Sequence, residues 1–225
     1  MANRDNHYEA AFEEFLRSRG VPYVAVDEAK RSLMSNGNSI KSLDFIVSGG
    51  VEVSANSDGD ACAARSVTWL VDVKGRRFPS GDIQKQYWKN WSTRDDLQSL
   101  AQWERLFGAS FRGLFVFAYD VLGSRSPLPA EELFEYRDSL YGFVAVALTD
   151  YAGHAHPISP RWDTWAMPAG DFRRFARPLA ELLGLDQRLT QGRCDGGAAN
   201  GDISKTGPPQ EIEKGRHTSG RPSEL

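Results

Sequence analysis

Two stretches of the sequence place charged side chains inside otherwise apolar runs. In Val71-Asp72-Val73-Lys74, a carboxylate and an amine alternate with two valines. Successive side chains of a β-strand point to opposite faces, so a strand here puts Asp72 and Lys74 on the same face. Asp44 interrupts a second apolar run, Leu43–Val47. Burial of such groups is costly unless they are paired or used, which makes these three residues the first candidates for chemistry.

If the two runs form neighbouring strands, Asp44 and Asp72 converge with the amine of Lys74 beside them. Clustered carboxylates raise each other's pKa unless a cation lies between them, and Mg²⁺ fits because it takes oxygen ligands and keeps several waters. A metal can activate water for attack on a phosphodiester, and a lysine can orient or deprotonate that water or stabilise charge on the phosphate. The alternative is a structural ion pair, which is the commoner origin of a lone Asp-x-Lys.

Helical spacing predicts the elements that carry these strands. Apolar residues recur every three or four positions over His7–Arg19, and Gly20 follows as a stop. A second helix is predicted from Ser92 to Gly108, with Ser92 and Asp95 spaced as a capping box, and a last helix over Asp171–Leu183. Asp95 and the adjacent Asp96 are interpreted as capping residues of that second helix, not as metal ligands.

Short β-rich runs predict the strands Val21–Val26, Leu43–Val47, Val67–Val73, Arg112–Tyr119 and Gly142–Thr149. Ser48–Ser66 is expected to be a long hairpin loop, and Lys74–Arg94 a basic, aromatic loop. The resulting order, α-β-β-β-α-β-β-α, predicts the α/β class with a mixed central sheet of about five strands flanked by helices.

The composition excludes several classes of protein. The chain has 225 residues, 40% of them hydrophobic, and a net charge of −3, which argues against a protein coated in positive charge for sequence-independent DNA binding. Cys62 and Cys194 are too few for a disulfide framework or a cysteine zinc site. No apolar run approaches the roughly 18 residues of a membrane span, and the first residues do not resemble a secretory signal. We therefore expect a cytoplasmic protein without a membrane partner.

The domain organisation follows from a change in composition near Arg188. We predict a single domain over residues 1–187 and a disordered tail over residues 188–225, where Gly, Pro and charged residues dominate. Residues 125–185 supply no candidate chemistry. They are expected to complete the core and to form one wall of a substrate channel.

A local basic segment directly follows the candidate site. Residues 74–94 contain six basic side chains against one acid, Asp82, which gives +5 within a chain of −3. Basic side chains neutralise phosphates, and aromatic side chains can stack on unpaired bases. Trp88 and Trp91 fit either stacking or packing, and packing is favoured for both. The predicted nucleic-acid-binding residues are Arg76, Arg77, Lys85, Lys89 and Arg94.

These features together resemble the PD-(D/E)xK nuclease superfamily, and within it the archaeal Holliday-junction resolvases and related small bacterial proteins. The likeness lies in a first helix with Glu9 that ends at Gly20, the apolar strand around Asp44, and the strand Trp69–Arg76 with its Asp-x-Lys. It covers about Asn6–Tyr119, half of the chain. The opening His7–Glu13 also resembles the signature of the bacterial HYExAFE family.

The resemblance implies a restriction-endonuclease-like core and an endodeoxyribonuclease that hydrolyses DNA by water attack with Mg²⁺, or with Mn²⁺. It makes Asp44, Asp72 and the carbonyl of Val73 metal ligands, Lys74 the catalytic lysine, and Glu9 a supporting acid that binds the metal directly or through water. It leaves open the structure of the DNA cleaved, DNA against RNA, and whether the chain forms a homodimer as resolvases do.

The sequence departs from the superfamily pattern at several points. Leu43 stands where a proline often precedes the first aspartate, and the Ser48–Ser66 insertion is long for a resolvase. Glu13 shares a helical face with Glu9 and could take its role, although the spacing to Gly20 favours Glu9 and an i+4 partner, Arg17, explains Glu13. The alternative function is a catalytically inactive nucleic-acid-binding or protein-interaction module on the same fold. A hydrolase of small phosphorylated molecules is the third reading.

Overall fold

The computed structural model describes residues 6–26, 32–33, 39–53, 64–81 and 83–185. The predicted tail, Cys62 and Cys194 lie outside these residues. The helices are α1 (His7–Ser18), α2 (Arg94–Phe107), the 3₁₀ helix η1 (Ala130–Glu132), α3 (Leu148–His154), α4 (Ala169–Phe175) and α5 (Leu179–Leu182). The strands are β1 (Tyr23–Ala25), β2 (Ser32–Leu33), β3 (Ser39–Ile40), β4 (Phe45–Val53), β5 (Ala64–Phe78), β6 (Ser92–Thr93), β7 (Phe111–Val121), β8 (Phe134–Tyr136), β9 (Ser139–Ala147), β10 (His156–Ser159), β11 (Thr164–Ala166) and β12 (Arg177–Pro178).

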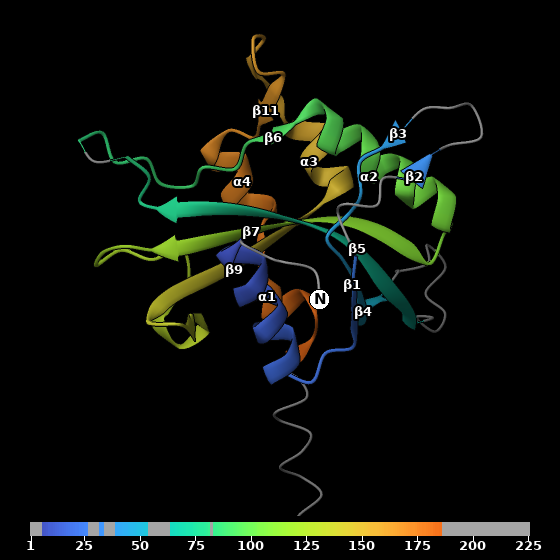
Figure 1. Cartoon of the computed structure of the whole chain (residues 1–225), viewed down its shortest axis with the longest axis horizontal. Coiled ribbons are helices and arrows are strands. Elements are labelled where there is room, and N and C mark those ends of the chain that lie inside the picture. The colour runs from blue at the N-terminus through green and yellow to red at the C-terminus, as the bar shows by residue number, and fades with distance from the viewer. Residues whose placement is uncertain (1–5, 27–31, 34–38, 54–63, 82, 186–225) are drawn as a thin grey trace, which may run out of the picture.

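The centre of the molecule is a seven-stranded mixed sheet in the order β1-β4-β5-β7-β9-β12, with β8 paired to β9 (Figure 1). β4 and β5 form an antiparallel hairpin, and α2 then connects β5 to β7, which runs parallel to it. β9 returns antiparallel to β7. The predicted α/β class with a mixed central sheet flanked by helices is confirmed, with more strands than the five expected. A parallel neighbour requires such a crossover, which fixes α2 over one face of the sheet.

Helices cover both faces of this sheet, with α1 and α5 on one side and α2, α3 and α4 on the other (Figure 1). β5 lies in the middle and is buried on both faces, so its alternating side chains enter two separate cores. Val71 and Val73 pack on the α1 side, whereas Leu70 and Phe78 pack on the α2 side. Asp72 and Lys74 have even numbers, so they face α2.

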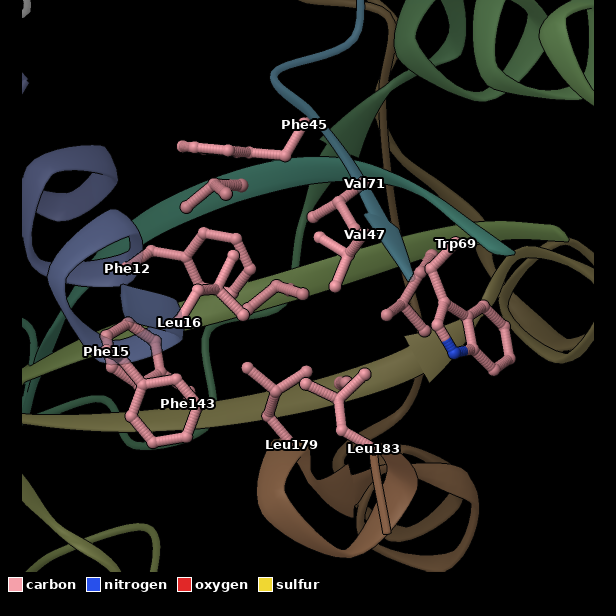
Figure 2. Close-up of a cluster of buried hydrophobic side chains, with 14 of the residues drawn as sticks. Phe12, Phe15, Leu16, Phe45, Val47, Trp69, Val71, Phe143, Leu179 and Leu183 are labelled. Carbon is pink, nitrogen blue, oxygen red and sulfur yellow. The ribbon is translucent and has the colours of Figure 1, made fainter. Parts of the chain in front are cut away.

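The core on the α1 side is built from aromatic and aliphatic side chains. Figure 2 shows Phe12 and Leu16 of α1 pointing towards the sheet, with Leu179 and Leu183 closing the cluster from the other end. The ring of Phe12 lies 5.0 Å from that of Phe45 and 5.6 Å from that of Phe143, both edge to face. The predicted apolar face of the first helix is therefore the face that packs against the sheet.

Both strands of the central hairpin extend further than predicted. Residues 48–53 and 64–66, which we expected in a loop, belong to β4 and β5, and residues 54–63 lie outside the described part. The expected loop from Lys74 begins within β5, which pairs with β7 as far as Phe78. Strand pairing uses main-chain groups, so polar side chains do not end a strand that already has a neighbour.

The predicted helix over Asp171–Leu183 is wrong. α4 ends at Phe175, a two-residue strand follows, and α5 starts at Leu179. Pro178 accounts for the break, because proline lacks the amide hydrogen that a helix needs and clashes with the preceding turn. The capping box of α2 also lies one residue later than predicted, with Thr93 and Asp96 in place of Ser92 and Asp95.

Candidate active site

Asp72 and Lys74 form an ion pair on the α2 side of β5. The Nζ atom of Lys74 lies 2.8 Å from Oδ1 of Asp72, and both side chains are almost fully buried. The same Nζ lies 2.9 Å from Oδ2 of Asp96, which α2 brings over the sheet. The ammonium of Lys74 is therefore held between two carboxylates, one from its own strand and one from the helix above.

Asp96 has several hydrogen-bond and ion-pair partners. Its Oδ2 accepts hydrogen bonds from the Thr93 amide at 2.9 Å and the Ser92 hydroxyl at 3.0 Å, and its Oδ1 pairs with Lys41. The Asp96 amide in turn donates to the Thr93 hydroxyl, which completes the capping box. The capping interpretation of Asp96 is confirmed but incomplete, because the same carboxylate also holds both lysines.

The segment before β4 is fixed to α2 by its main chain. The Lys41 amide donates to the Ser99 hydroxyl at 3.2 Å, and the Trp103 indole donates to the Lys41 carbonyl at 2.9 Å. A pocket of about 10 Å³, room for about one water molecule, lies between this segment, Asp72 and Asp96. Lys41 and Asp96 are the site residues that sequence reasoning missed. The capping-box spacing at Thr93 was the available signal for a buried Asp96.

Burial and charge act differently on the three central groups. Burial raises the pKa of Asp72 above its usual range, and this outweighs the lowering effect of Lys74. Burial also opposes ionisation of Asp96, but Lys74, Lys41 and the Thr93 amide together hold its pKa well below the usual range. Burial alone would lower the pKa of Lys74, yet the charges of Asp72 and Asp96 raise it. Lys74 is therefore a protonated ammonium at neutral pH.

Asp44 lies directly before β4 and next to β5, because its amide donates a hydrogen bond to the Val71 carbonyl at 3.0 Å. It is buried, and its Oδ2 accepts a hydrogen bond from the Val73 amide at 2.6 Å. The amide and carbonyl of one strand residue point to the same neighbour, so the Val73 carbonyl faces the edge where Asp44 lies. The structure thus brings together Asp44, Val73, Asp72 and Lys74 of the predicted site.

The donor set at this edge suits a hard cation. Two carboxylates and a main-chain carbonyl are oxygen ligands, and Mg²⁺ is commonly bound by one or two carboxylates together with waters and substrate phosphates. Among the described residues, no three His, Cys, Asp or Glu side chains lie close enough together to hold a metal ion. The fit to Mg²⁺ therefore depends on Asp44, Asp72 and the Val73 carbonyl, without a third acidic side chain.

Glu9 is placed differently from the other predicted ligands. It is buried on α1, which packs on the opposite face of the sheet, and its carboxylate accepts a hydrogen bond from the side chain of Asn6. The neighbouring Tyr8 lies against Gly75, where an added Cβ would come within 2.2 Å of its ring. The start of α1 thus adjoins β5 one residue beyond Lys74. Glu13 accepts a hydrogen bond from the Tyr23 hydroxyl at 3.0 Å.

The basic segment divides into exposed side chains and one that turns inward. Arg77, Lys85 and Arg94 are exposed, and Lys89 is half-buried. The guanidinium of Arg76 instead lies 4.0 Å from the centre of the Trp91 ring and donates to the Trp91 carbonyl. Burial lowers the pKa of Arg76, and the charges of Asp72 and Asp96 are among those that oppose this, so the guanidinium is within electrostatic range of the ion pairs.

Comparisons with known proteins find similar solved structures. Neither a protein-family model nor a curated protein matches the chain, so the likeness to the HYExAFE family stays a prediction. The fold is similar to that of Hjc, a Holliday junction resolvase from the archaeal hyperthermophile Archaeoglobus fulgidus, with 11% identity and a TM-score of 0.39. The alignment covers 81% of this chain and 97% of the resolvase. None of the described helices is long and apolar enough to cross a membrane.

Proposed function

We propose that this chain is a metal-dependent nuclease that hydrolyses DNA phosphodiester bonds at Asp44, Asp72 and Lys74. One observation carries the proposal. Asp72 and Lys74 lie together on one face of β5, and the carboxylate of Asp44 binds the amide of Val73 between them. A buried carboxylate paired with an ammonium, with a second carboxylate bound to the main chain between them, is an arrangement that can bind a metal and a phosphate together.

Each residue has a distinct task in this proposal. Asp44, Asp72 and the Val73 carbonyl would hold Mg²⁺ or Mn²⁺, which when bound polarises the phosphoryl oxygen and lowers the pKa of water. The raised pKa of Lys74 favours a role as hydrogen-bond donor to the phosphate or the attacking water over a role as base. Asp96 and Lys41 would position Lys74, because the same carboxylate binds both ammonium groups.

The surface next to the site favours a nucleic acid as substrate. Arg77, Lys85 and Arg94 are exposed, and they lie within the 20 residues that follow Lys74 in the chain. Exposed basic side chains bind phosphates without regard to sequence and make the affinity depend on salt. The net charge of −3 limits this contact to a local surface. A single phosphate backbone that passes the site fits this charge distribution better than a small phosphorylated molecule.

The test is a cleavage assay with branched, nicked, single-stranded and closed circular DNA in Mg²⁺ or Mn²⁺. We expect cleavage by the purified chain, and a loss of at least about a hundredfold in Asp72→Asn and Lys74→Met. Asp138→Asn, an exposed carboxylate at the turn before β9, is the matched control and should cleave normally. Circular DNA that is nicked identifies an endonuclease. No cleavage of any substrate in either metal would contradict the proposal.

A binding module without turnover is the second candidate, and one observation favours it. The ammonium of Lys74 is already neutralised by Asp72 and Asp96. Calorimetry with Mn²⁺ separates the two candidates, because a nuclease should lose metal binding in Asp44→Asn and Asp72→Asn. A binding module should keep its DNA affinity in EDTA, with a salt dependence that decreases when Lys85 or Arg94 is replaced.

A further inference from the structure

A groove next to the candidate site is lined by residues of two regions of the chain. One wall is the segment 86–91, which runs back from the end of β5 towards β6 (Figure 1). The other wall is formed by Ile158 of β10, Ala166 of β11, the following Met167, and Ala169 at the start of α4. The volume of this groove is about 530 Å³, within the range of ligand pockets. We call it the tryptophan groove after Trp88 and Trp91, which line it.

The wall formed by residues 86–91 is held rigidly by the core. The hydroxyl of Tyr119 donates to the Lys89 carbonyl at 3.1 Å, and that of Tyr151 donates to the Asn90 carbonyl at 2.6 Å. The side chain of Asn90 exchanges two hydrogen bonds with the main chain of Met167, at 2.9 and 3.0 Å, and so joins the two walls. A groove fixed in this way loses little entropy when a ligand binds.

The two tryptophans of the groove differ in their surroundings. Trp88 packs edge to face against Phe78 and Tyr119 and belongs to the core. Trp91 is 37% exposed, and the guanidinium of Arg76 lies over its ring and donates a hydrogen bond to its carbonyl. The predicted packing role is thus confirmed for Trp88, whereas Trp91, for which packing was also favoured, stays partly exposed. Aromatic surfaces of this kind stack on nucleobases.

The position of Trp91 connects the groove to the candidate site. Arg76, which holds the Trp91 ring, stands two residues after Lys74 on the same face of β5. Lys89 is the charged residue of the groove lining, and residues 83–94 contain three basic side chains and no acid. This charge favours a polyanion over an apolar peptide as the occupant.

We propose that the tryptophan groove binds one unpaired nucleobase, stacked on Trp91, of a nucleic-acid strand whose phosphate backbone contacts Lys89. The inference rests on the proposed function in one respect, that nucleic acid is the ligand. It adds a specificity: substrates with an unpaired base next to the cleavage point bind more tightly than continuous duplexes.

The test measures binding in EDTA, so that it does not depend on cleavage. The probe is a DNA duplex with one unpaired 2-aminopurine, compared with the same duplex fully paired. We expect the wild-type protein to bind the unpaired probe more tightly and to quench its fluorescence. Trp91→Ala should weaken this binding by roughly 5- to 150-fold, the range for loss of one base stack of about 1–3 kcal/mol, and should leave the paired duplex within twofold.

Trp162→Ala is the matched control. Trp162 is 67% exposed and has Arg161 over its ring at 5.2 Å, but it does not line the groove. It should bind both probes as the wild type does. Trp91→Phe keeps an aromatic surface and should restore most of the affinity, which separates stacking from a loss of folding.

The outcomes distinguish this inference from the proposed function. Equal effects of Trp91→Ala on both probes, the same effect in Trp162→Ala, or no binding of either probe would overturn the inference. Metal-dependent cleavage without any dependence on Trp91 would overturn the inference alone. Preference for the unpaired probe in a protein that never cleaves DNA would support the inference and overturn the proposed nuclease.

Discussion

The two faces of β5 bury very different side chains. The face towards α1 contributes only apolar groups to the core, and the face towards α2 begins with Leu70 and continues with charged groups. The residues on the α1 side are Val67, Trp69, Val71 and Val73, and those on the α2 side after Leu70 are Asp72, Lys74, Arg76 and the buried Phe78. One strand therefore adds only apolar groups to the core on one side, and places a network of ion pairs within the core on the other side.

This difference indicates where stability and function are located. Apolar burial stabilises a fold directly, whereas a buried ion pair loses most of its attraction to the cost of removing both charges from water. The α2 side contains two lysines and two aspartates around the start of α2. Hydrophobic side chains of similar volume would fold at least as well there, so the charges on this face are better explained by chemistry than by stability.

The largest expected effect is on the α1 side, in Phe12→Ala. Phe12 is fully buried and contacts Phe45 and Phe143. Removal of its ring should lower the free energy of unfolding by about 3–5 kcal/mol, measured by urea denaturation. Phe107→Ala, at a ring that is 39% exposed, is the control and should cost about 1 kcal/mol or less. A loss below about 1 kcal/mol in Phe12→Ala would contradict the view that this face carries the stability.

The sequence predicted the α1 side well, because its signals are local. Helical spacing identified α1 and its buried face, and the alternation in Val71–Lys74 identified the faces of β5. These patterns involve residues that are close together in the sequence, so they can be recognised without the rest of the fold. Asp44 was found for the same reason, since a carboxylate inside an apolar run stands out.

The α2 side was predicted only in part, because its contacts join distant segments. Asp96 has a sufficient local explanation as a capping residue, so nothing in the sequence indicated that its carboxylate also pairs with Lys74 and Lys41. Lys41 lies in a short segment without periodicity, and its contacts with the distant residues Ser99, Trp103 and Asp96 fix it. The inward turn of Arg76 depends in the same way on the path of the chain to Trp91.

The next effect in size is that of Asp96→Asn on the α2 side. Asparagine keeps the volume and one acceptor oxygen but leaves Lys41 and Lys74 without their shared anion. We expect a loss of about 3 kcal/mol in the free energy of unfolding at pH 7, the size found when one partner of a buried pair is removed. Urea denaturation measures it, and Asp95→Asn, an exposed acid in the same helical turn, is the matched control.

The stabilisation by the charge of Asp96 should depend on pH in a known direction. The pKa of Asp96 is lower in the folded protein than its ordinary 3.8, so the stabilisation by its charge is complete above pH 3.8. It decreases as the pH falls below 3.8 towards the lowered pKa. The difference between wild type and Asp96→Asn should therefore be largest at neutral pH and smaller at pH 3. A difference that stays constant with pH would show that the carboxylate does not act through its charge.

The smallest expected effect on stability, and the sharpest test of the comparison, is that of Asp72→Asn. The pKa of Asp72 is raised by burial, so ionisation of this carboxyl costs stability once the pH exceeds the ordinary 3.8 of an aspartate. The neutral isostere removes that cost, while Lys74 keeps Asp96 as its partner. We expect the free energy of unfolding at pH 7 to be unchanged or higher by about 1 kcal/mol.

The same variant should lose Mn²⁺ binding and DNA cleavage. This one substitution should therefore remove activity without lowering stability. Its stability advantage should disappear at pH 3, where Asp72 is protonated in the folded and unfolded chain alike. Denaturation at the two pH values, together with calorimetry at pH 7, measures both properties in one protein. A loss of 2 kcal/mol or more in the free energy of unfolding at pH 7 would show that Asp72 stabilises the fold. The charged groups of the α2 side would then contribute to stability, as the apolar groups of the α1 side do.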